Sequence, residues 1–280
     1  MLSSEVIRKI EEFVYSKPRS VQEISVYLKK NWRTVDRYIE EIVKDYGTLS
    51  VRVFREGTRG ALKIVYWSSI EKVSKSVFQE DLEETITREK GKMDFAAFDI
   101  FQYVDDSKKY AWIKNGVDES SAGRLKEFKD ILLQAKKQVL FFSGNLSFIN
   151  FDDGKVYVFE LLEELVKRNI SIKIIGRVDW VSKENIEKVL SLNMKYGKEL
   201  IEIRHRQQPL RATIIDNKLV NIKEVKEPSL RKKEVNEKLF IFYTITDKEW
   251  IEWLTKIFWK MFNSSINARK RLDELKKIKV

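Results

Sequence analysis

Apolar residues in the first 47 positions recur at helical spacing in three short segments. Residues 4–16, 21–30 and 33–47 each place an apolar side chain every three or four positions, which is the spacing of one helical face. Ser20 and Glu23 form an S-x-x-E capping box ahead of the second segment, which marks a helix start. The sequence therefore predicts three helices in close succession.

The pattern then changes from helical spacing to alternation. Residues 48–54 and 61–67 alternate apolar and polar positions, and the stretch between them, REGTRG, has the glycine and charge content of a hairpin tip. Three helices followed by a hairpin is the order of a winged helix-turn-helix, whose third helix enters the DNA major groove by its N-terminal end. The residues expected to contact DNA lie at the start of that helix and on the hairpin tip: Arg33, Thr34, Arg37, Tyr38, Arg55, Thr58 and Arg59.

Residues 20–47, SVQEISVYLKKNWRTVDRYIEEIVKDYG, resemble the helix-turn-helix of archaeal winged-helix transcriptional regulators, most clearly in NWRTVDRYI. The resemblance implies binding to double-stranded DNA. Winged helices also serve as protein docking modules, and in that case the arginines would form an ordinary solvated face.

A charged helix is predicted next, over residues 69–90, where an apolar stripe runs without glycine or proline. Such a helix pairs with its copy in a homodimer or packs on its own second domain, and the sequence leaves both open. The aromatic residues that follow are expected to be core rather than a platform for bases: Phe95, Phe98, Phe101 and Tyr103. Residues 69–119 are therefore interpreted as a connector between domains 1–68 and 120–280.

Helical and strand patterns alternate beyond residue 120, which predicts an α/β domain and a two-domain α+β chain overall. The expected helices are 121–137, 156–169, 182–197 and 247–265, and the expected strand regions are 138–145, 170–178, 199–206, 210–225 and 238–245. The last helix is apolar on most sides, so it must be buried or lie at a subunit interface.

This order resembles one half of a phospholipase D-like fold. Active members carry His-x-Lys followed by an aspartate on a hairpin, and aligning Asp216 with that aspartate places Arg211 at the lysine and Pro209 at the histidine. A proline cannot attack phosphorus, although Arg211 can still hold an anion and Asp216 can pair with it. A degenerate domain of this kind after a winged helix is similar to archaeal TrmB-like regulators, which implies a role in dimerisation or effector sensing.

Two further features of this domain are candidates for chemistry. Ser143 and Asn145 end an apolar strand at the rim where α/β sheets bind ligands, although a plain strand-to-loop turn explains them as well. The lone His205 lies four residues before Pro209, about 13 Å away along a strand, and is interpreted as a surface histidine.

Composition narrows the function further. A net charge of +11 favours a polyanionic partner, while one histidine and no cysteine leave no thiolate or imidazole-rich metal site, and we expect no cofactor. The phosphate-cradling and nucleophile-elbow motifs of nucleotide-binding proteins and hydrolases are absent from the sequence. Residues 1–13 show no long apolar run, so we expect no signal peptide or membrane span and a cytoplasmic protein.

The sequence thus predicts a non-enzymatic, homodimeric transcription regulator that binds double-stranded DNA. Its effector, a small molecule or a protein, is not identified by the residues. The alternatives are a phosphodiesterase or nuclease that uses the second domain, and a winged-helix interaction module of the transcription machinery.

Overall fold

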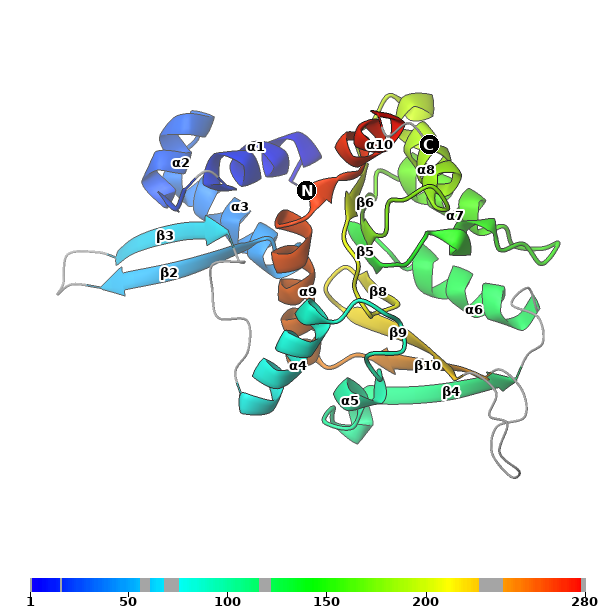
Figure 1. Ribbon diagram of the computed structural model, residues 1–280. Coiled ribbons are helices and arrows are strands. Elements are labelled where there is room, and N and C mark those ends of the chain that lie inside the picture. The colour runs from blue at the N-terminus through cyan, green and yellow to red at the C-terminus, as the bar shows by residue number, and fades with distance from the viewer. Residues whose placement is uncertain are drawn as a thin grey trace.

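The computed structural model describes residues 2–15, 17–55, 61–67, 76–115, 122–226 and 239–277. Within these residues the chain forms a winged helix-turn-helix and a larger domain of helices on a sheet, which lie against each other (Figure 1). The mixed fold class predicted from the sequence is confirmed.

The winged helix follows the predicted order of three helices and a hairpin. Its elements are α1 (Ser4–Tyr15), β1 (Arg19–Ser20), α2 (Val21–Leu28), α3 (Trp32–Asp45), β2 (Leu49–Arg55) and β3 (Ala61–Trp67). β3 pairs antiparallel with both other strands, so the sheet order is β1-β3-β2. β1 was not predicted, since two residues are too short for an alternating pattern to be recognised.

The larger domain alternates helices and strands. Its helices are α4 (Val77–Arg88), α5 (Phe98–Phe101), α6 (Ala122–Leu133), α7 (Val158–Lys167), α8 (Lys183–Tyr196), α9 (Lys248–Asn263) and α10 (Ala268–Lys277). Its strands are β4 (Lys109–Asn115), β5 (Gln138–Phe142), β6 (Ser171–Gly176), β7 (Ile201–His205), β8 (Ala212–Ile215), β9 (Leu219–Lys226), β10 (Leu239–Ile245) and β11 (Ile266–Asn267).

These strands form one sheet in the order β11-β7-β6-β5-β8-β9-β10-β4. β5, β6 and β7 are parallel, joined by crossovers through α7 and α8, and the remaining pairs are antiparallel. The sheet therefore changes from parallel to antiparallel pairing between β5 and β8.

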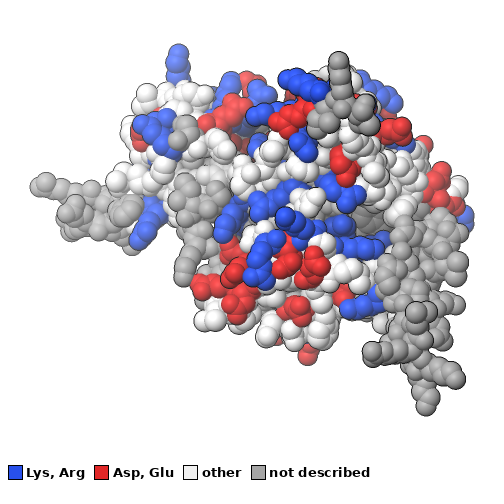
Figure 2. Space-filling view, in the orientation of Figure 1, with Lys and Arg blue, Asp and Glu red and all other residues white. Residues whose placement is uncertain are grey.

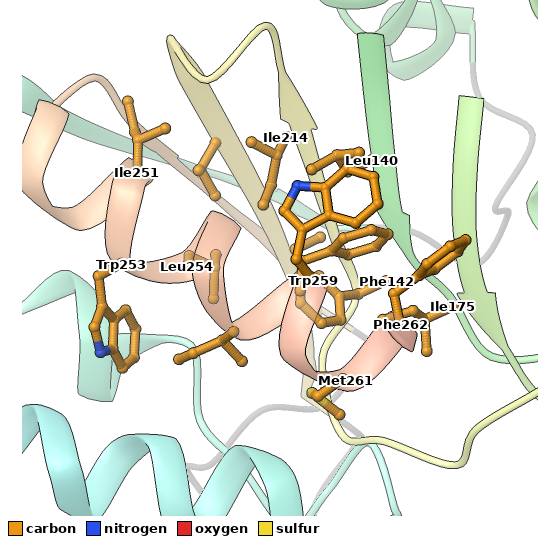
Figure 3. Packing of buried hydrophobic residues seen from close by; sticks show 14 of the residues in the cluster. Leu140, Phe142, Ile175, Ile214, Ile251, Trp253, Leu254, Trp259, Met261 and Phe262 are labelled. Carbon is orange, nitrogen blue, oxygen red and sulfur yellow. The ribbon is translucent and has the colours of Figure 1, made fainter. Parts of the chain in front are cut away.

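Each face of the sheet has its own apolar core, because successive strand residues point to opposite faces. In β5, Val139 and Phe141 join the core formed with α7, α8 and α10, whereas Leu140 and Phe142 join the core formed with α9. Figure 3 shows the second core, where Leu140, Phe142 and Ile214 face the side chains of α9. A strand buried on both faces explains the unbroken apolar run of the sequence at β5.

Helix α9 is buried within its own chain, which is one of the two situations that its apolar sequence predicted. One side of it covers the sheet, and the other contacts the winged helix. Trp259 makes that contact: its indole Nε1 donates to the Tyr46 carbonyl at 3.2 Å, and its ring lies edge-on to Trp67 with centroids 6.2 Å apart. The cores of the two domains are thus continuous through α9.

Polar contacts reinforce this junction at the end of α3. The Tyr46 carbonyl also accepts a hydrogen bond from Gln138 Nε2 at 2.9 Å, and Lys137 forms ion pairs with Asp45 and Glu41. The start of the central strand β5 is therefore bonded directly to the end of α3.

Gly47 allows the close approach of α3 and α9. It has a φ of +67°, which favours glycine, and a Cβ at this position would lie 3.0 Å from Thr255 Cγ2 in α9. The glycine that ends α3 therefore also provides the space into which α9 packs.

The segment predicted as a connector differs from expectation in three respects. Residues 109–115 form β4 at the edge of the large sheet, paired with β10, because their alternation of side chains suits an edge strand. α4 begins at Val77, and residues 68–75 lie outside the described part. Ile86 of α4 is fully buried and Glu83 pairs with Lys260 of α9 at 2.6 Å, so this helix packs on its own chain.

The expectation that all four aromatic residues of this segment are core is wrong in part. Phe95 is buried and Phe101 packs on the core, but Phe98 and Tyr103 are each 51% exposed. α5 has only four residues, so it cannot turn every aromatic side chain inward, and Tyr103 stacks on Phe78 instead.

The junction predicts the consequence of shortening Trp259. Trp259→Ala removes a buried indole from the core that the two domains share, and we expect it to lower the free energy of unfolding by about 3–5 kcal/mol, measured by urea denaturation. Trp180→Ala is the matched control: this indole is 49% exposed, and its loss should cost less than about 1 kcal/mol. Equal losses of unfolding free energy in the two variants would contradict the role of Trp259 in joining the two domains.

Candidate functional site

Local hydrogen bonds fix both ends of α2 and the turn that leads into α3. Ser20 Oγ accepts from the Glu23 amide and the Glu23 carboxylate accepts from the Ser20 amide, which confirms the predicted capping box. Lys29 ends α2 with a φ of +52°, and Ser25 Oγ donates to the Lys30 carbonyl at 2.7 Å. The start of α3 is therefore held in a defined direction.

α3 turns an apolar side inward and a basic side outward. The inward side consists of fully buried residues at helical spacing: Val35, Ile39 and Ile42. Arg33 and Arg37 are exposed, and Thr34 and Tyr38 are half-buried at the margins. The side chain of Asn31 caps the helix by accepting from the Arg33 amide at 2.9 Å. The four predicted contact residues of α3 thus lie together at its N-terminal half.

The carboxylates of α3 are all neutralised from other elements. They are Asp36, Glu40, Glu41 and Asp45. Lys63 of β3 pairs with the first two, at 2.6 Å from Asp36, and this hydrogen bond raises the pKa of Lys63. Lys137 pairs with the last two. Arg33 and Arg37, by contrast, form no ion pair with any residue that the structure describes.

The hairpin tip can be placed only in part. Arg55 is the last residue of β2, and its side chain lies outside the described part, as do residues 56–60 with Thr58 and Arg59. The paired strands β2 and β3 do agree with the predicted hairpin. The expected contacts of these three residues with DNA stay predictions.

Basic side chains are not confined to the winged helix. Figure 2 shows Lys and Arg gathered across the middle of the face, toward the larger domain, with Asp and Glu concentrated below them. The net charge is therefore shared between the domains, and a test of α3 requires a cation of the larger domain as its control.

Three of the four predicted anion or effector residues meet at one cavity of about 310 Å³. Ser143 and Asn145 follow β5, and Arg211 precedes the adjacent strand β8. Because these two strands are antiparallel, all three residues lie at the same end of the strands. Asp216 is at the other end of β8 and does not line the cavity.

The expected pairing of Arg211 with Asp216 is wrong. The carboxylate of Asp216 accepts from three consecutive backbone amides, those of Lys136, Lys137 and Gln138, at 2.7, 2.8 and 2.9 Å. Its φ of +50° places it in the turn between β8 and β9. Strand β8 separates the two side chains, and Asp216 instead anchors the start of β5.

His205 has a structural contact of its own. The histidine lies at the end of β7, three strands from β8, which corresponds to about 14 Å across the sheet. Its ring Nδ1 accepts from the Val178 amide at 2.8 Å, so it is half-buried rather than the simple surface histidine expected. Within the described part of the chain, no hydrogen bond or ion pair joins His205 to Arg211 or Pro209.

Sequence reasoning missed the partners that define both sites. Lys63 and Lys137 come from β3 and from the start of β5, and no local pattern links them to the carboxylates of α3. Thr213 also lines the cavity, and here a signal existed: alternation along β8 places it on the face opposite Ala212 and Ile214.

The described residues offer neither a cluster of metal ligands nor a membrane-spanning helix. None of their His, Asp and Glu side chains forms a group of three or more suited to a metal ion. None of their helices is both long enough and apolar enough to cross a membrane.

Comparisons with known proteins give distant structural likenesses. No protein-family model matches the sequence, and no curated protein matches it. Nuc from Salmonella typhimurium, a phospholipase D family member, is 15% identical over 57% of this chain and 98% of its own, with a TM-score of 0.40. TrmBL2, an archaeal chromatin protein, is 13% identical over 95% of this chain and 94% of its own, with a TM-score of 0.38. NucT from Helicobacter pylori is 16% identical over 57% of this chain and 99% of its own, with a TM-score of 0.37.

The hydrogen bond to His205 predicts a pH effect. Burial lowers the pKa of His205 below its ordinary 6.5, so the folded chain binds the proton less tightly than the unfolded chain. Stability from this contact is complete above pH 6.5 and falls as the pH is lowered. His205→Asn keeps an acceptor at the Nδ1 position but does not titrate.

We therefore expect the wild type to lose stability relative to His205→Asn between pH 7 and about pH 5, measured by urea unfolding at each pH. A difference between the two proteins that does not change with pH would contradict the assignment.

Proposed function

We propose that this chain is a DNA-binding transcription regulator that inserts the N-terminal half of α3 into the major groove. One observation carries the proposal: Arg33 and Arg37 are exposed and have no ion partner among the described residues, while every carboxylate of the same helix is paired with a lysine. A solvated helix surface has no need to separate its charges in this way. A polyanion would meet the two guanidinium groups without competition from neighbouring carboxylates.

The arrangement suits base recognition. Arginine binds guanine through two parallel hydrogen bonds, and residues at the N-terminal end of a recognition helix reach the base edges. Thr34 and Tyr38 flank the arginines and would contact the sugar-phosphate backbone. Arg55, Thr58 and Arg59 would bind phosphates from the hairpin tip.

The proposed assembly is a homodimer on a two-fold symmetric DNA site. Two recognition helices would then read half-sites about one helical turn apart. Sedimentation velocity of the full chain, alone and with DNA, measures this: we expect twice the monomer mass on one duplex, and a single copy per duplex would contradict it.

The larger domain is proposed to be non-catalytic. Pro209 stands where the phospholipase D-like motif requires its histidine nucleophile, and it offers no electron pair for attack on phosphorus. His205 is engaged with the Val178 amide on a strand three places away. The domain would then serve to position the winged helix and to sense an effector.

Loss of one recognition arginine should weaken DNA binding. A selection from random duplex fragments provides the cognate site, and on it we expect Arg37→Ala to cost about 1–3 kcal/mol in a fluorescence-anisotropy titration. The control is Arg269→Ala in α10, an exposed arginine of the larger domain, which should leave the affinity unchanged. If both variants lose equally, general charge and not α3 explains the binding.

Salt should weaken the wild-type complex steeply. With six or more phosphates neutralised, affinity falls by roughly 10³-fold between 50 and 200 mM salt. Absence of any retained fragment in the selection would favour the protein-docking alternative instead.

Nuclease activity is testable separately. A supercoiled plasmid incubated with the protein, with and without Mg²⁺, should stay intact, because the motif position of the nucleophile is occupied by Pro209. Nicking by the wild type that persists at the same level through further purification would contradict a non-catalytic domain.

A further inference from the structure

We propose that the cavity between β5, β8 and β9 binds a small single-ring aromatic carboxylate. The cavity measures about 310 Å³, and its lining includes residues of β5, β8, β9, α6 and the segment after β5. Figure 1 shows that α6 lies on the side of the sheet opposite α9. This site is independent of the DNA interface and stands whether or not α3 binds DNA.

Arg211 provides the site for the carboxylate. Arg211 is half-buried, and this burial, together with the nearby charge of Arg177, lowers its pKa. Its Nη1 donates to the carbonyls of Leu210 and Gln208, at 2.7 and 3.3 Å, but no described residue accepts from its Nε or Nη2. These two groups form the edge of the guanidinium that binds both oxygens of a carboxylate.

Gly144 keeps space beside this edge. A Cβ on Gly144 would lie 2.7 Å from Arg211 Nη2 and 3.3 Å from Nε, so any larger residue would displace the guanidinium. The glycine has no positive φ that would otherwise account for it. Its role is therefore best explained by the room it leaves at Arg211.

Two hydroxyl groups line the same cavity. Ser143 and Thr213 are each only 7% exposed, and among the described residues neither hydroxyl has a hydrogen-bond partner. A ligand oxygen that accepts from either hydroxyl would gain a hydrogen bond in this cavity. Together with Arg211 they supply donors from two adjacent strands.

The charge of the cavity selects an anion. The charged residues in the described part of its lining are Lys92, Arg211 and Lys223, with no aspartate or glutamate among them. Lys223 Nζ lies 4.5 Å from the ring centroid of Phe240, so its charge is held at this face of the sheet. The potential inside is therefore positive, and an anionic ligand would be attracted.

The remaining walls select an aromatic ring. Phenylalanine side chains from several elements surround the polar groups: Phe128, Phe141, Phe148, Phe151 and Phe242. Phe141 and Phe148 are 5.3 Å apart between centroids and tilted by 33°, so their faces and edges are available to a further ring. A volume near the lower limit of ligand pockets fits a single ring with one carboxylate.

Calorimetric titration of the full chain with three probes tests the proposal. We expect benzoate to bind, and benzamide and inorganic phosphate to bind at least tenfold more weakly. Benzamide lacks the negative charge, and phosphate lacks the aromatic ring. Benzamide binding as tightly as benzoate would show a merely apolar pocket. Phosphate binding as tightly would show that the phenylalanine walls contribute nothing, and failure of benzoate to bind at 10 mM would also overturn the proposal.

Variants locate the binding. Arg211→Gln and Gly144→Ala should each weaken benzoate at least tenfold, the first by removing the charge and the second by displacing the guanidinium. Thr213→Val, which keeps the shape of the side chain, should weaken it severalfold, whereas Arg269→Gln on α10 should have no effect. Thermal melting establishes that each variant is folded, and unchanged benzoate affinity in folded Arg211→Gln would overturn the proposal.

Discussion

The contact of α9 with both domains is the constraint on which the rest of the structure depends. Its apolar side chains cover one face of the large sheet, and Trp259 at its C-terminal part reaches the carbonyl of Tyr46 and the ring of Trp67. A helix apolar on most sides must be covered from more than one direction. The sheet and the winged helix cover it together, so α3 keeps a fixed orientation relative to the larger domain.

The same junction determines where the charges of α3 lie. Lys137 at the start of β5 neutralises the two carboxylates near the end of the helix, and Lys63 of β3 neutralises the two nearer its middle. Asp36, Glu41 and Asp45 are thereby largely buried, and Glu40 stays exposed beside Lys63. Arg33 and Arg37, near the N-terminal end, are exposed and have no ion partner among the described residues. This separation of charge is the physical basis for the proposed interaction with DNA.

Much of the fold could be predicted from local pattern, because helical spacing and alternation report on burial directly. Val35, Ile39 and Ile42 identified the inner face of α3, and the cap at Ser20 identified the start of α2. β4 was assigned to a connector instead of the sheet, because its partner β10 lies more than 100 residues away and leaves no local signal. The candidate sites were harder to predict for the same reason, since their residues come from distant parts of the sequence. Ser143 and Arg211 were found separately, but the role of Asp216 as an anchor for three backbone amides depends on chain reversal at the β8–β9 turn.

The central claim is that the N-terminal half of α3 touches DNA. Photo-crosslinking from single positions tests it most directly, with benzoyl-phenylalanine in place of Arg33 and, as the control, in place of Met194, which is 77% exposed on α8 of the larger domain. We predict crosslinks to the selected duplex from position 33 and none from position 194. Equal crosslinking from both positions, or crosslinking from position 194 alone, would contradict the account.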